Sequence, residues 1–119
     1  MSHQKPREYV YCADGFNMSV QASKNCYCQP KANGKNVVYS RVEIGFPSER
    51  EELLDEYAEG YTIGEQRWTE TVYPYVPSQI VALVIAKHGG MVSGELPRLG
   101  FINIIPILRK EKNSENSDY

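Results

Sequence analysis

An alternating segment near the N-terminus restricts the fold more than any other feature of the sequence. Its apolar residues recur at every second position, with polar residues between them: Phe16, Met18, Val20 and Ala22. Because successive side chains of a strand point to opposite faces of a sheet, this period predicts a strand with one buried and one solvated face. Residues 7–12 are rich in β-forming residue types, and Asp14-Gly15 is a turn signal between the two segments. The sequence therefore predicts a β-hairpin here.

Four later segments also have the composition of strands. They are residues 25–29, 37–46, 68–76 and 99–108. Segment 37–46 is the clearest, and its alternation predicts one face made of Val38, Ser40, Val42 and Ile44. Pro74 and Pro106 interrupt two of the others. Since proline has no amide hydrogen to donate, we expect Pro74 either to place its strand at a sheet edge or to end it early, and we expect the segment with Pro106 at an edge if it is a strand.

Two helices are predicted between these strands. Ser48 and Glu51 have the spacing of a reciprocal capping pair, which predicts a helix from there to about Glu59. The acidic residues of this helix are expected on its solvated face. Residues 77–78 open a second helix, which ends at residues 87–88 before two glycines. Apolar residues cover most of its circumference, so we expect this helix to be the buried one.

These elements predict an α+β protein, with a small, mainly antiparallel sheet and two helices packed on it. A chain of 119 residues is long enough for one domain but too short for two well-packed ones. Its hydrophobic fraction of 41% and charged fraction of 24% are usual for globular proteins. We therefore expect a single domain over residues 7–108. Residues 109–119 are almost all polar or charged, which predicts a disordered tail.

Charge and hydropathy argue against two classes of partner. The formal net charge of −2 provides no field that attracts nucleic acid. The longest apolar stretch is far shorter than the ~20 residues of a membrane-spanning helix, so no membrane contact is expected. The N-terminus lacks the apolar core of a secretory signal. We therefore expect the protein to act in the cytoplasm.

Three cysteines and one internal histidine are the candidates for site chemistry. Cys12, Cys26 and Cys28 are an odd number of thiols in a chain without an export signal, so we expect them to be reduced. Together with His88 they could be imagined as a zinc site, but one C-x-C pair with two distant residues lacks the paired spacing of structural zinc sites. Cys12 is typical of a small core residue, and His88 of a favourable charge at a helix end.

The sequence therefore assigns no residue to catalysis, to a metal or to a cofactor, and it identifies no binding residue. Residues 89–90 are glycines that follow a helix, whereas a phosphate-binding loop would precede one. It stays open whether the three cysteines and His88 meet in space. The oligomeric state and the strand order stay open as well.

Five segments between Tyr9 and Gly90 form a recurring pattern of strand ends and turns. They are YVYCADGFNMSVQAS (9–23), YCQP (27–30), VEIGFPS (42–48), TVYPYVP (71–77) and KHGG (87–90). Together these segments resemble a group of small uncharacterised proteins encoded by tailed bacteriophages and prophages. The resemblance implies a phage or prophage origin, and it implies no established activity.

Three functions are consistent with these observations. The first is a phage-encoded accessory protein that binds a host protein or a small ligand in the bacterial host cytoplasm, without catalysis. Nine tyrosines support it, since tyrosine suits recognition surfaces as well as half-buried sheets. The second is a virion structural or assembly protein, which would form a homo-oligomer. The third is a small enzyme that uses Cys12, Cys28 or His88.

Structural features would separate these three functions. A concave pocket lined by tyrosines would favour ligand binding. A flat apolar patch would favour assembly. A meeting of His88 with a cysteine would favour catalysis.

Overall fold

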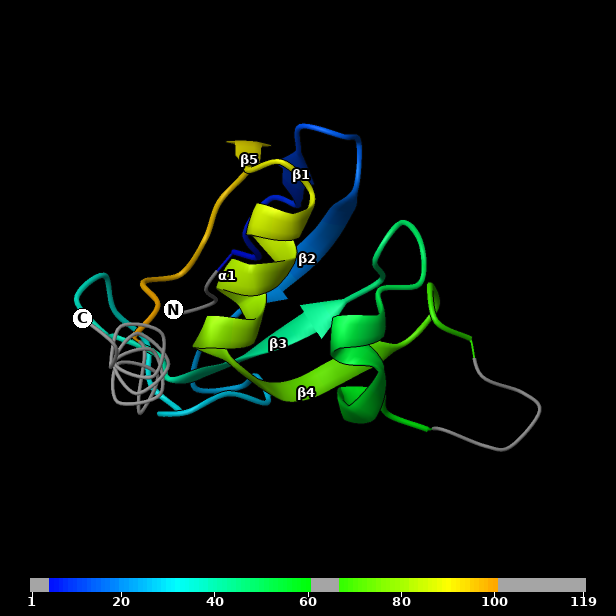
Figure 1. Ribbon diagram of the computed structural model, residues 1–119. Coiled ribbons are helices and arrows are strands. Elements are labelled where there is room, and N and C mark those ends of the chain that lie inside the picture. The colour runs from blue at the N-terminus through cyan, green and yellow to red at the C-terminus, as the bar shows by residue number, and fades with distance from the viewer. Residues whose placement is uncertain (1–4, 61–66, 101–119) are drawn as a thin grey trace, which may run out of the picture.

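The computed structural model describes residues 5–60 and 67–100. They form a five-stranded antiparallel sheet in the order β4-β3-β2-β1-β5, together with a 3-10 helix and an α-helix (Figure 1). The strands are β1 (Val10–Cys12), β2 (Asn17–Gln21), β3 (Arg41–Gly45), β4 (Val72–Pro77) and β5 (Met91–Ser93). The helices are η1 (Glu52–Tyr57) and α1 (Ser78–Lys87). The α+β class, with two helices on a mainly antiparallel sheet, is therefore confirmed.

The predicted hairpin is present as β1 and β2, with Val10 opposite Met18. The carboxylate of Asp14 closes the turn by accepting from the backbone amide of Phe16 at 2.9 Å. Gly15 has a φ of +98°, which glycine adopts without steric cost. The alternating apolar side chains are all buried, as predicted: Phe16, Met18, Val20 and Ala22. Most of the predicted last strand and all of the predicted tail lie outside the described residues.

The core lies on one face of the sheet. The inward side chains of the strands pack with Val81 and Val84 of α1 and with Leu54 of η1. Both helices contact β4 and lie on the same side of it (Figure 1). Apolar residues do surround α1, but Leu83 is 49% exposed. Of the two helices α1 has more buried residues, as predicted, but the sheet covers only one face of it.

β4 is an edge strand, which is one of the two outcomes that Pro74 predicts. A bulge places Pro74 and Tyr75 of β4 opposite the single residue Glu43 of β3. Tyr75 has a φ of +56°, which residues with a side chain rarely adopt. Two hydrogen bonds hold it there: its amide donates to the Tyr27 carbonyl at 3.1 Å, and its carbonyl accepts from the Arg41 guanidinium at 3.0 Å. The bulge thus joins the edge strand to the loop around Tyr27.

The predicted strand at residues 25–29 is wrong. The amide of Cys28 donates to the carbonyl of Cys26 at 2.9 Å, which makes a tight turn in place of an extended segment. Gln29 alone forms an isolated antiparallel bridge, with Arg41. The turn stops the segment from pairing along its length.

The predicted strand at residues 37–46 is shortened at its start. It begins at Arg41, and the alternation before that point is opposite to the prediction, because Tyr39 is 1% exposed and Val38 is 49% exposed. The backbone of Tyr39 pairs with a distant loop, since its amide donates to the Arg98 carbonyl at 2.8 Å. This long-range pairing sets which side chain faces the core.

The first predicted helix is a short 3-10 helix, and its predicted capping pair does not form. The hydroxyl of Ser48 accepts instead from the amide of Asn17 at 3.0 Å. Glu51 caps η1 alone, because its carboxylate accepts from the amide of Leu53 at 3.0 Å. Glu51 is also buried, which contradicts the solvated position expected for the acidic residues here. Glu51 can be buried because Lys87 and His88, at the end of α1, bond to its carboxylate.

The one-sided packing of α1 can be tested by a matched pair of substitutions. Val84→Ala should lower the free energy of unfolding by about 2 kcal/mol, since it removes buried carbon atoms and leaves a cavity. Leu83→Ala is the control on the exposed side and should cost less than about 1 kcal/mol. Urea denaturation followed by circular dichroism measures both. Equal losses would contradict the packing of α1 on one face.

Candidate functional site

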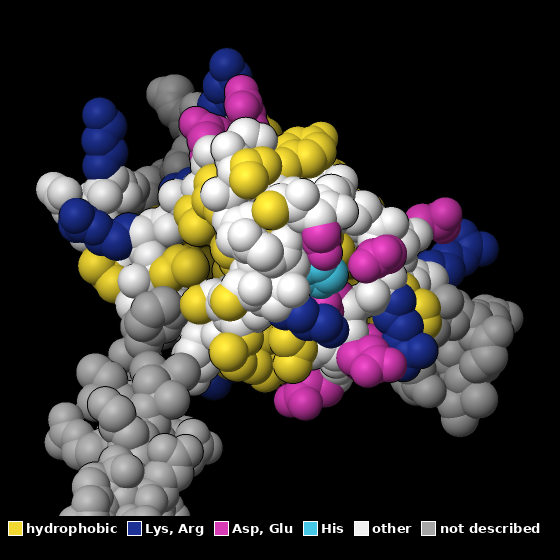
Figure 2. All heavy atoms as spheres, turned by 45° about the horizontal axis from the view of Figure 1, so that its top comes forward, with side chains coloured by type: hydrophobic (Ala, Val, Ile, Leu, Met, Phe, Trp, Pro, Cys, Tyr) yellow, Lys and Arg dark blue, Asp and Glu magenta, His cyan; other side chains and the backbone are white. Residues whose placement is uncertain are grey.

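A buried histidine connects three elements of the fold. His88 is the C-cap of α1, and its side chain is 7% exposed. Its Nδ1 lies 2.7 Å from Oδ2 of Asp14 in the β1–β2 turn, and its Nε2 lies 2.6 Å from Oε1 of Glu51 before η1. The ring of Phe16 stacks on the imidazole, with 4.1 Å between centroids. Figure 2 shows the histidine only as a small area among acidic and basic side chains.

The carboxylate of Glu51 is the most deeply buried member of this group, with a side chain that is 1% exposed. Besides His88, it accepts from the ammonium group of Lys87 at 2.8 Å and from the amide of Leu53 at 3.0 Å. A carboxylate tolerates burial only when donors of this kind satisfy it. We refer to four side chains as the histidine cluster: Asp14, Glu51, Lys87 and His88.

Neighbouring charges decide the protonation of the cluster. Burial alone would lower the pKa of His88, but the carboxylates of Asp14 and Glu51 outweigh it and raise that pKa above its ordinary value of 6.5. Burial would raise the pKa of Glu51, but bonds from Lys87, a backbone amide and His88 leave it lowered. The amide of Phe16 and the His88 side chain lower the pKa of Asp14. The cluster therefore favours an imidazolium between two carboxylates.

The histidine cluster does not have the arrangement of a cysteine enzyme. Carboxylates engage both nitrogens of His88, so the ring offers no base to a thiol. Burial and the nearby Asp14 raise the pKa of Cys12, and burial raises the pKa of Cys28. A nucleophilic cysteine needs a lowered pKa instead. The cluster is therefore a structural connection between elements.

Sequence reasoning placed His88 at a helix end but missed its partners. Asp14 is 74 residues away from it and Glu51 is 37 residues away. The local pattern assigned Asp14 to a turn and Glu51 to a helix cap. Both residues also perform those local roles, so no local signal marked the long-range contacts.

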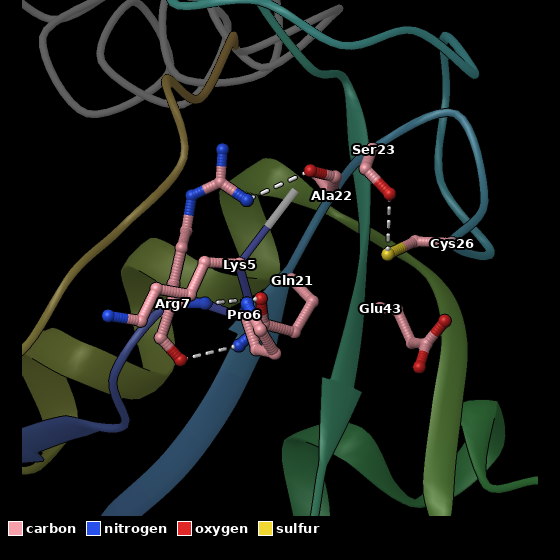
Figure 3. Close-up of a pocket in the computed structure, with 8 residues that line it drawn as sticks. All are labelled: Lys5, Pro6, Arg7, Gln21, Ala22, Ser23, Cys26 and Glu43. Carbon is pink, nitrogen blue, oxygen red and sulfur yellow. Dashed lines mark hydrogen bonds between the residues drawn. The ribbon is translucent and has the colours of Figure 1, made fainter. Parts of the chain in front are cut away.

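A second candidate site is a cavity of about 170 Å³ between the N-terminal segment, the end of β2 and the following loop (Figure 3). Eight described residues line it: Lys5, Pro6, Arg7, Gln21, Ala22, Ser23, Cys26 and Glu43. These side chains are charged, polar or small, and not the tyrosines whose presence would have favoured a ligand pocket. Of these residues, only Cys26 was a candidate for site chemistry from the sequence, and no role was assigned to it.

Gln21 holds the N-terminal segment in place as one wall of the cavity. The amide of Arg7 donates to Oε1 of Gln21 at 2.9 Å, and Nε2 of Gln21 donates to the Arg7 carbonyl at 2.8 Å. The guanidinium of Arg7 donates to the Ala22 carbonyl at 2.8 Å. Farther along the segment, the amide of Glu8 donates to the carboxylate of Glu95 at 2.7 Å. This wall is therefore bonded to two separate parts of the fold.

Cys26 and Glu43 line the cavity on the side opposite the N-terminal segment (Figure 3). The sulfur of Cys26 lies 3.2 Å from the hydroxyl of Ser23. Oε1 of Glu43 accepts from the amide of Tyr27 at 2.9 Å, which holds the carboxylate against the loop. The ammonium group of Lys31 donates to the Cys26 carbonyl at 2.8 Å. These contacts fix the loop that carries the thiol.

The three cysteines differ in access. Cys12 and Cys28 are buried, whereas Cys26 is partly exposed and faces the cavity. The thiol of Cys28 donates to the carbonyl of Ser23 at 3.0 Å. Within residues 5–60 and 67–100, no group of three or more His, Cys, Asp or Glu side chains is arranged to hold a metal ion.

Comparisons of the chain with models of protein families, with curated proteins and with solved structures found no match. In the part of the chain that the structure describes, no helix is long and apolar enough to cross a membrane. The geometry of the two candidate sites is therefore the basis for a functional argument.

The histidine cluster should make stability greatest between about pH 4.5 and 6.5. The raised pKa of His88 contributes stability that is complete below 6.5 and is lost as pH rises through the folded pKa. The lowered pKa values of Asp14 and Glu51 contribute stability that is complete above 3.8 and 4.5, and that is lost as pH falls through the folded values. Urea denaturation over a series of pH values measures this profile.

His88→Gln is the control for that profile, because glutamine keeps hydrogen-bonding groups but does not titrate. The variant should lose the decline in stability on the alkaline side of the maximum. An alkaline decline of the same size in the variant would show that another group causes it.

Proposed function

We propose that the chain is a non-catalytic binding protein whose cavity binds a small zwitterionic ligand, with one carboxylate and one ammonium group. The observation that carries this proposal is that basic and acidic residues both line the cavity. Lys5 and Arg7 of the N-terminal segment and Glu43 of β3 all line the cavity. A guanidinium group matches a carboxylate in geometry, and a carboxylate attracts an ammonium group.

The size of the cavity supports a small ligand. Its volume of about 170 Å³ is well above the roughly 10–15 Å³ that one water needs. It is below the roughly 300–1,000 Å³ of pockets for drug-sized molecules. A ligand with the size of an amino acid fits this range.

The histidine cluster supports binding without catalysis. The nitrogens of His88 are engaged by carboxylates, and the buried thiols of Cys12 and Cys28 have raised pKa values. An enzyme that used these residues would need a free base beside a reactive thiol. A binding protein needs neither.

A phage origin and action in the bacterial host cytoplasm belong to the same proposal, and they rest on the resemblance over residues 9–90. A phage accessory protein that removes a host metabolite needs a ligand site and no chemistry. A host protein as the partner stays an alternative, and so does a virion assembly role. Native mass spectrometry tests the latter, since assembly requires a symmetric homo-oligomer.

Isothermal titration calorimetry with three ligand classes tests the proposed site. Zwitterionic amino acids should bind, whereas a dicarboxylate such as succinate and a diamine such as putrescine should bind more weakly, because each lacks one of the two charges. Glu43→Gln should weaken amino-acid binding roughly tenfold, since a charge-assisted contact is lost. The glutamine oxygen can still accept from the Tyr27 amide, so the loop should keep its position.

Glu49→Gln is the matched control, because Glu49 is exposed and does not line the cavity. It should leave amino-acid affinity unchanged. Absence of binding by every amino acid, or equal effects of the two substitutions, would contradict the proposed ligand site.

A further inference from the structure

We infer that the loop between β2 and β3, together with the bulge of β4, forms a second binding surface, whose ligand is single-stranded nucleic acid. On this surface two tyrosine rings stack on bases and three lysines contact phosphates. We refer to five side chains as the tyrosine–lysine patch: Lys24, Tyr27, Lys31, Lys35 and Tyr75. This activity goes beyond the proposed ligand site and does not depend on it, because none of the five residues lines the cavity.

Charge is unevenly distributed along the chain. The formal net charge is −2, but residues 23–42 contain four basic residues and no acidic one. Lys24, Lys31 and Lys35 are exposed in the loop between β2 and β3 (cyan in Figure 1). Salt screens exposed charges that are more than about 10 Å apart at 0.1 M, so a phosphate at the loop interacts mainly with these lysines. The expectation that net charge excludes nucleic acid therefore does not hold for this loop.

Two aromatic rings lie beside the same charges. The ring centroids of Tyr27 and Tyr75 are 6.0 Å apart, and the ammonium group of Lys31 lies 5.5 and 5.4 Å from them. Tyr27 is 45% exposed, which leaves ring surface for a base. The Lys31 ammonium has three donors, of which one bonds to the Cys26 carbonyl at 2.8 Å. A ring and an ammonium group at this separation match the base and the phosphate of one nucleotide.

A strained backbone presents Tyr75, and this observation is independent of the charges. Its φ of +56° is rare for a residue with a side chain. A bulge turns a side chain in a direction that a regular strand does not allow. The amide of Tyr75 donates to the carbonyl of Tyr27 at 3.1 Å, so the bulge brings the two rings together. Strain of this kind is concentrated at sites of function.

Bonds within the loop and to the core hold the patch in one shape. The amide of Lys24 donates to Oδ1 of Asn33 at 2.9 Å, which joins two distant parts of the loop. The hydroxyl of Tyr39, a buried residue, donates to the carbonyl of Ala32. A surface that is formed before binding loses less conformational entropy when its ligand arrives.

The patch fits a single strand better than other polyanions. The bases of a duplex are already stacked on one another, so their faces are not available to a tyrosine ring. An acidic peptide would pair with the lysines but would leave the two rings without a stacking partner. Stacking on tyrosine accepts every base, so we expect little sequence preference.

Fluorescence anisotropy of the full chain with a labelled oligothymidylate tests the inference. A strand of about 16 nucleotides covers the upper end of known single-strand site sizes. It should bind at low salt, and its affinity should fall as salt rises, because lysines that neutralise phosphates release counterions. The same strand annealed to oligoadenylate should bind at least severalfold more weakly. Absence of binding, or equal affinity for the duplex, would overturn the inference.

Substitutions separate stacking from charge. Tyr27→Ala should weaken binding roughly tenfold at an unchanged salt dependence, since a stacking partner is lost. The bonds that hold Tyr27 in the loop come from its backbone, so this variant keeps them. Lys31→Gln should weaken binding and should also reduce the salt dependence, by about one phosphate contact.

Arg67→Gln is the matched control for the loss of one positive charge. Arg67 is exposed, it pairs with Glu70, and it lies outside the patch. It should change the affinity less than Lys31→Gln does. Equal losses in these two variants, or an unchanged affinity in Tyr27→Ala, would overturn the inference. Competition by polyglutamate that is as strong as competition by unlabelled oligothymidylate would also overturn it, because the patch would then bind any polyanion.

Glu43→Gln distinguishes this inference from the proposed function. It should weaken amino-acid binding in the cavity but should preserve or strengthen oligothymidylate binding, because it removes a negative charge beside Tyr27. If no amino acid binds while oligothymidylate does, the proposed ligand site is wrong and the patch stands. If oligothymidylate binding is lost in this variant, the nucleic acid depends on the cavity and the inference is wrong.

Discussion

The imidazole of His88 is bonded to a carboxylate at each nitrogen, and these two bonds connect the end of α1 to the β1–β2 turn and to the start of η1. Backbone bonds support the same connection, because the amide of Asp14 donates to the His88 carbonyl at 3.2 Å and that of Ala13 to the Gly90 carbonyl at 2.9 Å. Three elements that are distant in sequence therefore meet at one ring. The face of the sheet that α1 and η1 cover depends on this contact, and Glu51 can be buried because the contact supplies its donors.

The cavity depends on a different contact, the pair of hydrogen bonds between Gln21 and the backbone of Arg7. Gln21 ends β2, so the strand that builds the core on one face also fixes the N-terminal segment on the other. None of the lining residues belongs to the histidine cluster. The histidine cluster and the cavity therefore lie at separate places in the protein.

Some of the tyrosines are buried in the core, and others lie at the surface around Lys31. Tyr39 and Tyr73 are buried, and their hydroxyls donate to the carbonyls of Ala32 and Trp68. Burial raises the pKa of Tyr73 to about 12. These two support the interpretation of abundant tyrosine as part of a half-buried sheet. Two others are Tyr27, in the loop after β2, and Tyr75, in β4. The ammonium group of Lys31 lies over both of their rings.

Local patterns were enough to predict the hairpin, the edge position of β4 and the bounds of α1, because alternation, proline and glycine act on the backbone within a few residues. Local patterns failed at Tyr39, whose side chain is turned to the core by pairing with a loop about sixty residues later. Local patterns also failed to predict that Glu51 is buried, because its partners Lys87 and His88 are distant in sequence. The sequence by itself determined the hairpin, the strands β3 and β4 and the helix α1, but it did not indicate β5 and it wrongly predicted a strand at residues 25–29. Only the tertiary structure decided which charged groups are buried together and which thiol faces a cavity, since those contacts join residues that no local period relates.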